Sequence, residues 1–166
     1  MPLNLLKKYS GLLDINGLNE NQRKASLQGI FDRDIRNNPN FVFNSKTIRP
    51  IVKDGMDAME ILLHHLTTTI VDEKTRKRDY DRFRSERLHW IKHHISSKQP
   101  NGLFIFSVKD KTAIRTYIYD SNEKYVIILE PFRNTADYYL LTAYHLTGKN
   151  KNKIKSKYKR RLNKVY

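Results

Sequence analysis

The sequence predicts an α+β fold in which one helix packs on a four-stranded antiparallel sheet, preceded by a small helical N-terminal region. Three observations carry this prediction. Before residue 97, apolar residues recur at three- and four-residue steps, which is typical of helices with one buried face. From Leu103 onward they fall into short runs separated by turn-forming residues, which is typical of strands. A chain of 166 residues is long enough for one domain with an extension.

Three segments before residue 97 have helical spacing. Asn19 or Asn21 would cap the start of the first, because a short polar side chain can accept from free N–H groups there. Pro100 and Gly102 would end the third. The helical segments are residues 19–36, 54–70 and 82–96, and a charged joint at 72–81 connects the last two.

Four short runs rich in Ile, Val, Phe and Tyr follow the third helix. The loops between them are short, and short loops connect antiparallel neighbours, because parallel strands need long crossovers. The runs should therefore form a meander on which the third helix packs. They are residues 103–108, 113–119, 125–129 and 138–146.

Alternation along a strand assigns its side chains to two faces. Arg115 and Tyr117 share one face of the second run, whereas Tyr138, Thr142 and Tyr144 share one face of the fourth. Buried polar groups must be hydrogen-bonded. Arg115, Thr142 and Tyr144 are therefore either a site at the edge of the core or the satisfied surface of a half-exposed sheet.

The composition excludes several classes of protein. With no Cys, the chain cannot be a disulfide scaffold or use a thiol nucleophile, a zinc–thiolate site or an iron–sulfur cluster. The N-terminus lacks the apolar run of a signal peptide, and no window is long enough for a membrane span. We expect a cytoplasmic protein without a membrane partner, with export by another route as the alternative.

Positive charge is concentrated in the second part of the chain. Of 32 Lys and Arg residues, 22 follow residue 75, against 8 of the 17 Asp and Glu residues. Residues 148–166 contain nine basic residues and no acidic one. This imbalance favours a nucleic-acid partner over a membrane surface or mere solubility. The expected division is a helical region at 1–75, an α+β domain at 76–147 and a basic tail at 148–166.

The third predicted helix carries the densest set of reactive side chains. Arg84, Arg87 and His94 follow one another, with Ile91, at three- and four-residue steps, so they would line one stripe of that helix. Two guanidinium groups and an imidazole would then face the same side.

Two pairs of histidines allow other interpretations. His89 and His93 are four residues apart and could hold zinc, but no third ligand is evident, so we expect no metal site. His64 and His65 end the second helix, where they would either interact with the helix dipole or belong to a site.

An imidazole, several arginines, a hydroxyl and a phenol, without a carboxylate cluster, suit transesterification at an RNA phosphate. A base removes the 2′-OH proton, the oxygen attacks phosphorus, and an acid protonates the leaving 5′-oxygen. Histidine suits the proton transfer, and arginine grips phosphate oxygens in pairs. DNA lacks the 2′-OH, and two-metal nucleases need carboxylates, so RNA is the favoured substrate.

The runs RFRSERLHWIKHHI, RTYIYD, KYVIILEP and YYLLTAYHL resemble the barnase/EndoU/colicin/RelE-like (BECR) nuclease superfamily, in particular its phage and prophage domains. The resemblance covers residues 82–146, about two fifths of the chain. It implies a metal-independent, toxin-like RNase without a cofactor, acting on tRNA or other RNA in bacterial or phage conflict, with an immunity or antitoxin protein as a candidate partner. The host would be a bacterial or phage-infected cell, or a target cell into which the protein is delivered.

The same resemblance implies a site built from a basic or His residue on the helix, an Arg on a middle strand, and a Thr with a Tyr on the last strand. We expect His94 to transfer the proton, while the helix residue stays open among Arg84, Arg87, His93 and His94. The expected phosphate ligands are Arg87, Arg115, Thr142 and Tyr144, and the expected substrate contacts are Arg84, His93, Tyr117, Lys151 and Lys153.

The expectation is thus a metal-independent endoribonuclease that cleaves RNA by 2′-OH transesterification. The alternative is a non-catalytic basic nucleic-acid-binding protein of phage origin. A third interpretation, a structural phage or secretion component, predicts no affinity for nucleic acid at moderate salt.

Overall fold

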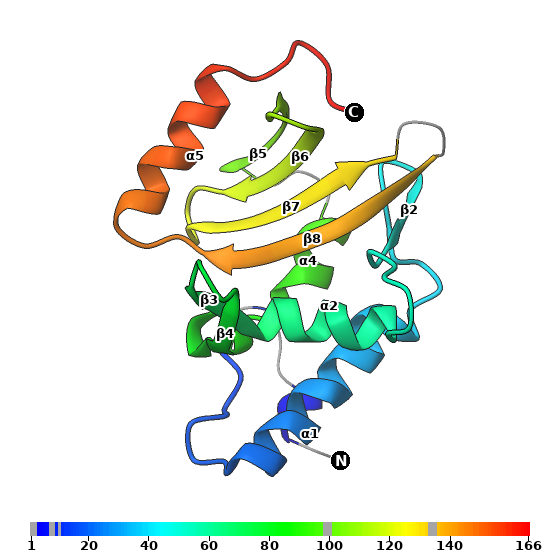
Figure 1. The fold of residues 1–166 in the computed structure, drawn as a ribbon, viewed down its shortest axis with the longest axis vertical. Helices are drawn as coiled ribbons and strands as arrows, with labels where there is room; N and C mark the ends of the chain where they lie inside the picture. The colour runs from blue at the N-terminus through cyan, green and yellow to red at the C-terminus, as the bar shows by residue number, and fades with distance from the viewer. Residues whose placement is uncertain (1–2, 7–8, 10, 98–100, 133–135) are drawn as a thin grey trace.

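The computed structural model describes residues 3–6, 9, 11–97, 101–132 and 136–166. Within these ranges the chain is α+β, with one six-stranded mixed sheet and one two-stranded sheet (Figure 1). The strands are β1 (Val42–Phe43), β2 (Lys46–Arg49), β3 (Thr68–Asp72), β4 (Lys77–Tyr80), β5 (Leu103–Lys109), β6 (Ile114–Asp120), β7 (Tyr125–Pro131) and β8 (Asp137–His145). The large sheet has the order β1-β2-β8-β7-β6-β5, and β3 pairs with β4.

The predicted four-stranded antiparallel sheet is wrong. β5 to β8 do pair antiparallel in chain order, but β1 and β2 extend the sheet beyond β8. β2 lies parallel to β8, with Thr47 opposite Asp137 and Arg49 opposite Tyr139. The two added strands are two and four residues long, too short to show a period in the sequence.

Helices and helical turns surround the large sheet. Asn19 caps the first long helix: its Oδ1 accepts from the Gln22 N–H at 2.9 Å, and the Gln22 side chain accepts from the Asn19 N–H at 3.1 Å. Asn19, and not Asn21, is therefore the cap. The helical segments are η1 (Leu3–Leu6), α1 (Glu20–Phe31), the π-helix η2 (Asp32–Arg36), α2 (Ala58–Thr67), α3 (Arg82–Ser85), α4 (Trp90–Ser96) and α5 (Lys149–Lys159).

The second predicted helix ends three residues early. Thr67 Oγ1 donates to the Leu63 carbonyl at 2.9 Å, and Thr68 Oγ1 donates to the His64 carbonyl at 2.6 Å. These bonds satisfy the last free carbonyls of α2, and the β-branched run that follows favours extended backbone. The charged segment expected as a joint is therefore the β3–β4 hairpin.

The third predicted helix is two short helices, α3 and α4, separated by a turn. The Leu13 N–H donates to the Glu86 carbonyl at 2.9 Å, and the Trp90 N–H bonds instead to the Arg87 carbonyl. Leu13 thus occupies the Glu86 carbonyl, which the Trp90 N–H would bind in a continuous α-helix. The helix is interrupted at this point. The predicted stripe of Arg84, Arg87 and His94 is broken with it.

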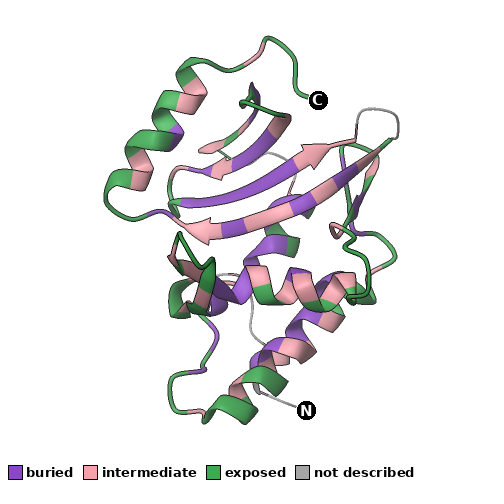
Figure 2. Cartoon of the chain, viewed as in Figure 1, coloured by how far each residue is buried: buried purple, intermediate pink, exposed green. Residues whose placement is uncertain are grey.

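Two apolar clusters lie on the two faces of the large sheet. The first joins α1, α2 and α4 to residues such as Ile127 and Leu140, and the second joins Ile154 of α5 to residues such as Phe106 and Val126. Figure 1 shows α5 on one side of the sheet and α1 and α2 on the other, and Figure 2 shows β7 buried along most of its length.

The three segments expected as separate regions contribute residues to the same apolar clusters. The expected boundary after residue 75 lies in the β3–β4 turn, and residues from both sides of it form the first cluster. The expected basic tail is mostly helical: Ile154 is 2% exposed, and the Leu162 N–H donates to the Ser107 carbonyl on β5 at 2.8 Å. None of the described helices is long and apolar enough to cross a membrane.

Candidate active site on the α5 face of the sheet

Arg84 lies where α3 meets the C-terminal half of β8, beyond the residues that pair with β2. Its Nη1 donates to Thr142 Oγ1 at 3.1 Å and to the His65 carbonyl at 3.2 Å. Its Nε lies 3.3 Å from an Asp81 carboxylate oxygen, within ion-pair range, but it is buried and makes no aligned hydrogen bond. The side chain is only 15% exposed, so these contacts hold the guanidinium group in place.

One phenol, that of Tyr144, lies beside this guanidinium group, and a second, that of Tyr117, lies beside Lys157. The Arg84 guanidinium carbon is 5.2 Å from the centre of the Tyr144 ring. Burial raises the pKa of Tyr144, and Tyr117 raises it further, against the opposing charges of Arg84 and Lys157. Lys157 Nζ of α5 lies 5.4 Å from the centre of the Tyr117 ring. We name Arg84, Thr142, Tyr144, Tyr117 and Lys157 the Arg84 cluster.

A β-bulge in β8 brings Thr142 and Tyr144 to this cluster. Ile128 pairs with Thr142, but the next residue of β7, Leu129, pairs with Leu140, so β8 contains one extra residue. The bulge reverses the alternation. Leu140 therefore packs in the first apolar cluster and Tyr144 in the second. The prediction that Tyr138 shares a face with Thr142 and Tyr144 is wrong for this reason.

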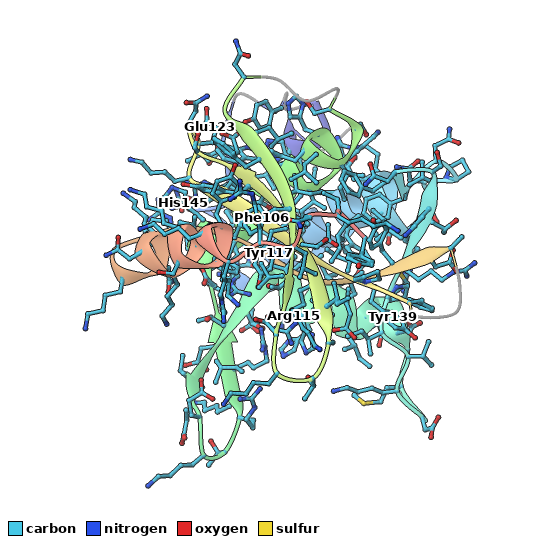
Figure 3. The ribbon with its side chains drawn as sticks, turned by 90° about the horizontal axis from the view of Figure 1, so that it is seen from above. Phe106, Arg115, Tyr117, Glu123, Tyr139 and His145 are labelled. Carbon is cyan, nitrogen blue, oxygen red and sulfur yellow. The ribbon has the colours of Figure 1, made fainter. Side chains whose placement is uncertain are left out.

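Asp110 ties three cations together next to the Arg84 cluster. Its carboxylate oxygens lie 2.9 Å from Lys157 Nζ and 3.6 Å from nitrogens of both Arg115 and Arg160. The Tyr117 hydroxyl donates to it at 3.4 Å. Burial works to raise the pKa of Asp110, but the hydrogen bond from Lys157 and the three positive charges outweigh burial and lower it. Figure 3 shows Arg115 and Tyr117 along β6.

The structure places His94 away from this face. The ring is 2% exposed; Nδ1 donates to the Trp90 carbonyl at 2.8 Å, and Nε2 lies 3.0 Å from Asp120 Oδ2. Both nitrogens are therefore occupied inside the protein. The expected proton transfer by His94 has no support in this geometry, because a substrate cannot reach the imidazole.

Two other residues expected in the site, Arg87 and His93, make contacts within the protein instead. Arg87 lies over the Trp90 ring at 5.2 Å and donates to the Phe83 carbonyl at 2.9 Å, while the His93 ring stacks on Tyr9 with centroids 3.6 Å apart. Four of the expected residues belong to the Arg84 cluster, namely Arg84, Tyr117, Thr142 and Tyr144. Arg115 is connected to the cluster only through Asp110, and His94, Arg87 and His93 lie outside it. Lys151 and Lys153 lie on α5, outside the Arg84 cluster.

Several residues near the site were not predicted. Lys157 was one of many alternating lysines, and only the packing of α5 singles it out. His65 belonged to a histidine pair whose role was open. Its main chain binds Arg84, and its pKa is lowered by burial first and then by nearby charges, those of Arg78, Lys53, His64 and Arg84. No sequence signal distinguished Asp110.

Across the described ranges, no group of three or more His, Cys, Asp or Glu side chains is placed to hold a metal ion. Comparisons of the chain with family models, curated proteins and solved structures found no match. A function for this chain therefore has to be inferred from the geometry of the Arg84 cluster itself.

Proposed function

We propose that the protein is a metal-independent endoribonuclease and that the Arg84 cluster is its active site. The observation that carries the proposal is the contact of Arg84 with Thr142 and Tyr144. It places a fixed guanidinium group beside a hydroxyl and a neutral phenol. Donors fixed in advance around one point are what a phosphodiester needs in its pentacovalent state.

The proposed reaction is a transesterification at phosphorus. The 2′-oxygen forms a bond to phosphorus while the bond to the 5′-oxygen breaks, leaving a 2′,3′-cyclic phosphate. Arg84 and Lys157 offset the charge on the phosphoryl oxygens, and Thr142 donates to one of them. Tyr144 supplies the proton to the 5′-oxygen, because a phenol carries its proton at neutral pH.

His65 is the proposed acceptor of the 2′-OH proton in place of His94. Its main-chain carbonyl is bound by Arg84, which holds the end of α2 beside the cluster, and His65 also lines an adjoining cavity of about 460 Å³ with Lys53. Burial and the charges of Arg78, Lys53, His64 and Arg84 lower its pKa, so the imidazole is neutral near pH 7 and able to take a proton.

The test is incubation of the purified protein with total RNA in EDTA, followed by analysis of the new ends. Wild type should cleave and leave 2′,3′-cyclic phosphates, and Tyr144→Phe should be impaired because it lacks the hydroxyl. Tyr119→Phe is the matched control, since Tyr119 packs against the same apolar cluster outside the Arg84 cluster. Cleavage that depends strictly on magnesium would refute the proposal.

The second candidate is a non-catalytic nucleic-acid-binding protein. The buried position of His94 favours it, because the residue expected to transfer protons is absent from the cationic face. This candidate predicts that the protein binds labelled RNA without cutting it and that Arg115→Ala weakens binding. The nuclease proposal includes tRNA as a candidate substrate and an immunity or antitoxin protein as a candidate inhibitor. Both proposals include phage origin and a cytoplasmic location.

A further inference from the structure

A second basic site lies at the β5–β6 end of the sheet. A cavity of about 1070 Å³ is lined there by Lys46, Lys109 and Lys111, with Glu130 as the acidic residue of its wall. Lys109 and Lys111 are exposed. The volume is more than enough for a nucleotide, and the excess of lysines favours an anion.

Aromatic rings form much of the remaining wall. The ring centroids of Phe132 and Tyr139 lie 3.7 Å apart, and Tyr166, which also lines the cavity, is 37% exposed. The main chain of Tyr166 is fixed: its N–H donates to Ser107 Oγ at 3.0 Å, and its carbonyl accepts from Thr116 Oγ1 at 3.0 Å and from the Tyr138 hydroxyl. These hydrogen bonds to the sheet therefore hold Tyr166 at the cavity.

Arg115 links the wall of the cavity to the proposed active site through two ion pairs. An Arg115 nitrogen lies 4.0 Å from Glu130 in the cavity wall, and another lies 3.6 Å from Asp110, which binds Lys157 of the Arg84 cluster. Glu130 pairs with Tyr139 across β7 and β8. Figure 3 shows Arg115 on β6 and Tyr139 on β8.

We propose that this cavity binds a nucleotide of single-stranded RNA that flanks the phosphodiester at the Arg84 cluster. The base stacks on Tyr139 or Tyr166, and the backbone phosphate binds Lys109 and Lys111. Lysines and aromatic rings in one cavity suit an unpaired strand, because a base in a duplex has no free face to stack. The inference rests on the proposed function for the identity of its ligand.

The test measures binding of a labelled single-stranded oligonucleotide of 2′-fluoro nucleotides by fluorescence anisotropy. This probe has no 2′-OH, so binding is read without cleavage. Tyr139→Ala should weaken binding about tenfold, and Tyr139→Phe should restore it, because the ring and not the hydroxyl stacks. Lys111→Glu should weaken binding and make it less salt-dependent, whereas Lys74→Glu, an exposed change in the β3–β4 turn, should not.

Wild-type affinity in both Tyr139→Ala and Lys111→Glu would overturn the inference, as would equal affinity for a duplex. If Tyr139→Ala fails to fold, the affinity of Lys111→Glu compared with that of Lys74→Glu decides. The two proposals fail separately. Tight binding that depends on the cavity, without cleavage of an all-ribose strand, would refute the nuclease and keep the site. If all cavity variants cleave and bind RNA like wild type, the nuclease proposal stands and the cavity is not a binding site.

Discussion

At the scale of single residues, Arg84 determines the geometry of the proposed site. One of its nitrogens binds both Thr142 and the His65 carbonyl, while its Nε faces the Asp81 carboxylate without an aligned bond. A planar guanidinium fork can hold these partners and still grip a phosphate. A lysine amine offers one centre of charge on a flexible stem, so it cannot replace the fork.

Arg84→Lys should therefore lower the single-turnover rate of RNA cleavage about a hundredfold to a thousandfold, the usual effect of losing one fixed donor. The control is Arg82→Lys on the same helix, whose side chain is 58% exposed and pairs with Glu86. Cleavage by Arg84→Lys at the wild-type rate would remove Arg84 from the reaction.

His65 gives the reaction a defined dependence on pH. Burial and the charges of Arg78, Lys53, His64 and Arg84 lower its pKa from 6.5. Because the neutral ring is the active form, kcat/KM should fall only below pH 6.5. His65→Gln should lower the rate and remove this fall of kcat/KM at acidic pH, whereas His64→Gln should keep the fall. An identical fall in His65→Gln would show that another group accepts the proton.

The same lowered pKa affects stability. Between the folded pKa and 6.5, the unfolded chain binds a proton at His65 that the folded chain does not bind. The free energy of unfolding should therefore fall as the pH drops through this window. Urea unfolding at several pH values should show a shallower fall for His65→Gln than for wild type. A steeper fall in the variant would contradict the assigned direction.

At the scale of elements, the sequence predicted local features and missed those that depend on distant segments. The cap at Asn19 and the strands β5 to β8 follow from nearby residues. The break between α3 and α4 follows from Leu13, which binds the Glu86 carbonyl from more than 70 residues away. The parallel pairing of β2 with β8 also joins distant segments. No local pattern contains such contacts.

The candidate site was predicted in part for the same reasons. Thr142 and Tyr144 were expected together with Arg115 and a residue of the third helix, through alternation and a resemblance that ignored the bulge; in the structure their partner from that segment is Arg84. Leu140 and Leu141 are equally apolar, so the sequence does not show which of them is the extra residue. His94 was expected in the site because a continuous helix would have placed it there.

The packing of α5 can be tested through its buried residue. Ile154 is 2% exposed in the second apolar cluster, so Ile154→Ala should lower the free energy of unfolding by about 2–5 kcal/mol. The measurement is urea unfolding, with exposed Lys155→Ala as the control. Equal stability of the two variants would indicate a solvated tail that does not hold Lys157 in place.

At the scale of the whole molecule, each face of the sheet carries an apolar cluster, and one face also carries the lysines of α5. The first cluster packs α1, α2 and α4 on one face, and α5 brings its lysines to the other. Most of the positive charge follows residue 75. RNA would therefore cross the molecule from the Arg84 cluster past Arg115 to the cavity beside the β5–β6 turn.

This path should make binding strongly dependent on salt. Five contacts, from Arg84, Lys157, Arg115, Lys109 and Lys111, would give a slope of log affinity against log salt of about −3 to −4, at about −0.7 per phosphate of a single strand. Anisotropy titrations of the 2′-fluoro probe over a range of salt concentrations measure it. A slope near zero would show that the cationic face does not bind the backbone.

The most direct measurement concerns the 2′-OH at the cut. An RNA oligonucleotide is first cleaved in EDTA to map its cut site, and the single ribose on the 5′ side of that site is then replaced by 2′-deoxyribose. We predict that the replacement abolishes cleavage there, while the all-ribose strand yields a 2′,3′-cyclic phosphate. Equal cleavage of both strands would contradict transesterification at the Arg84 cluster.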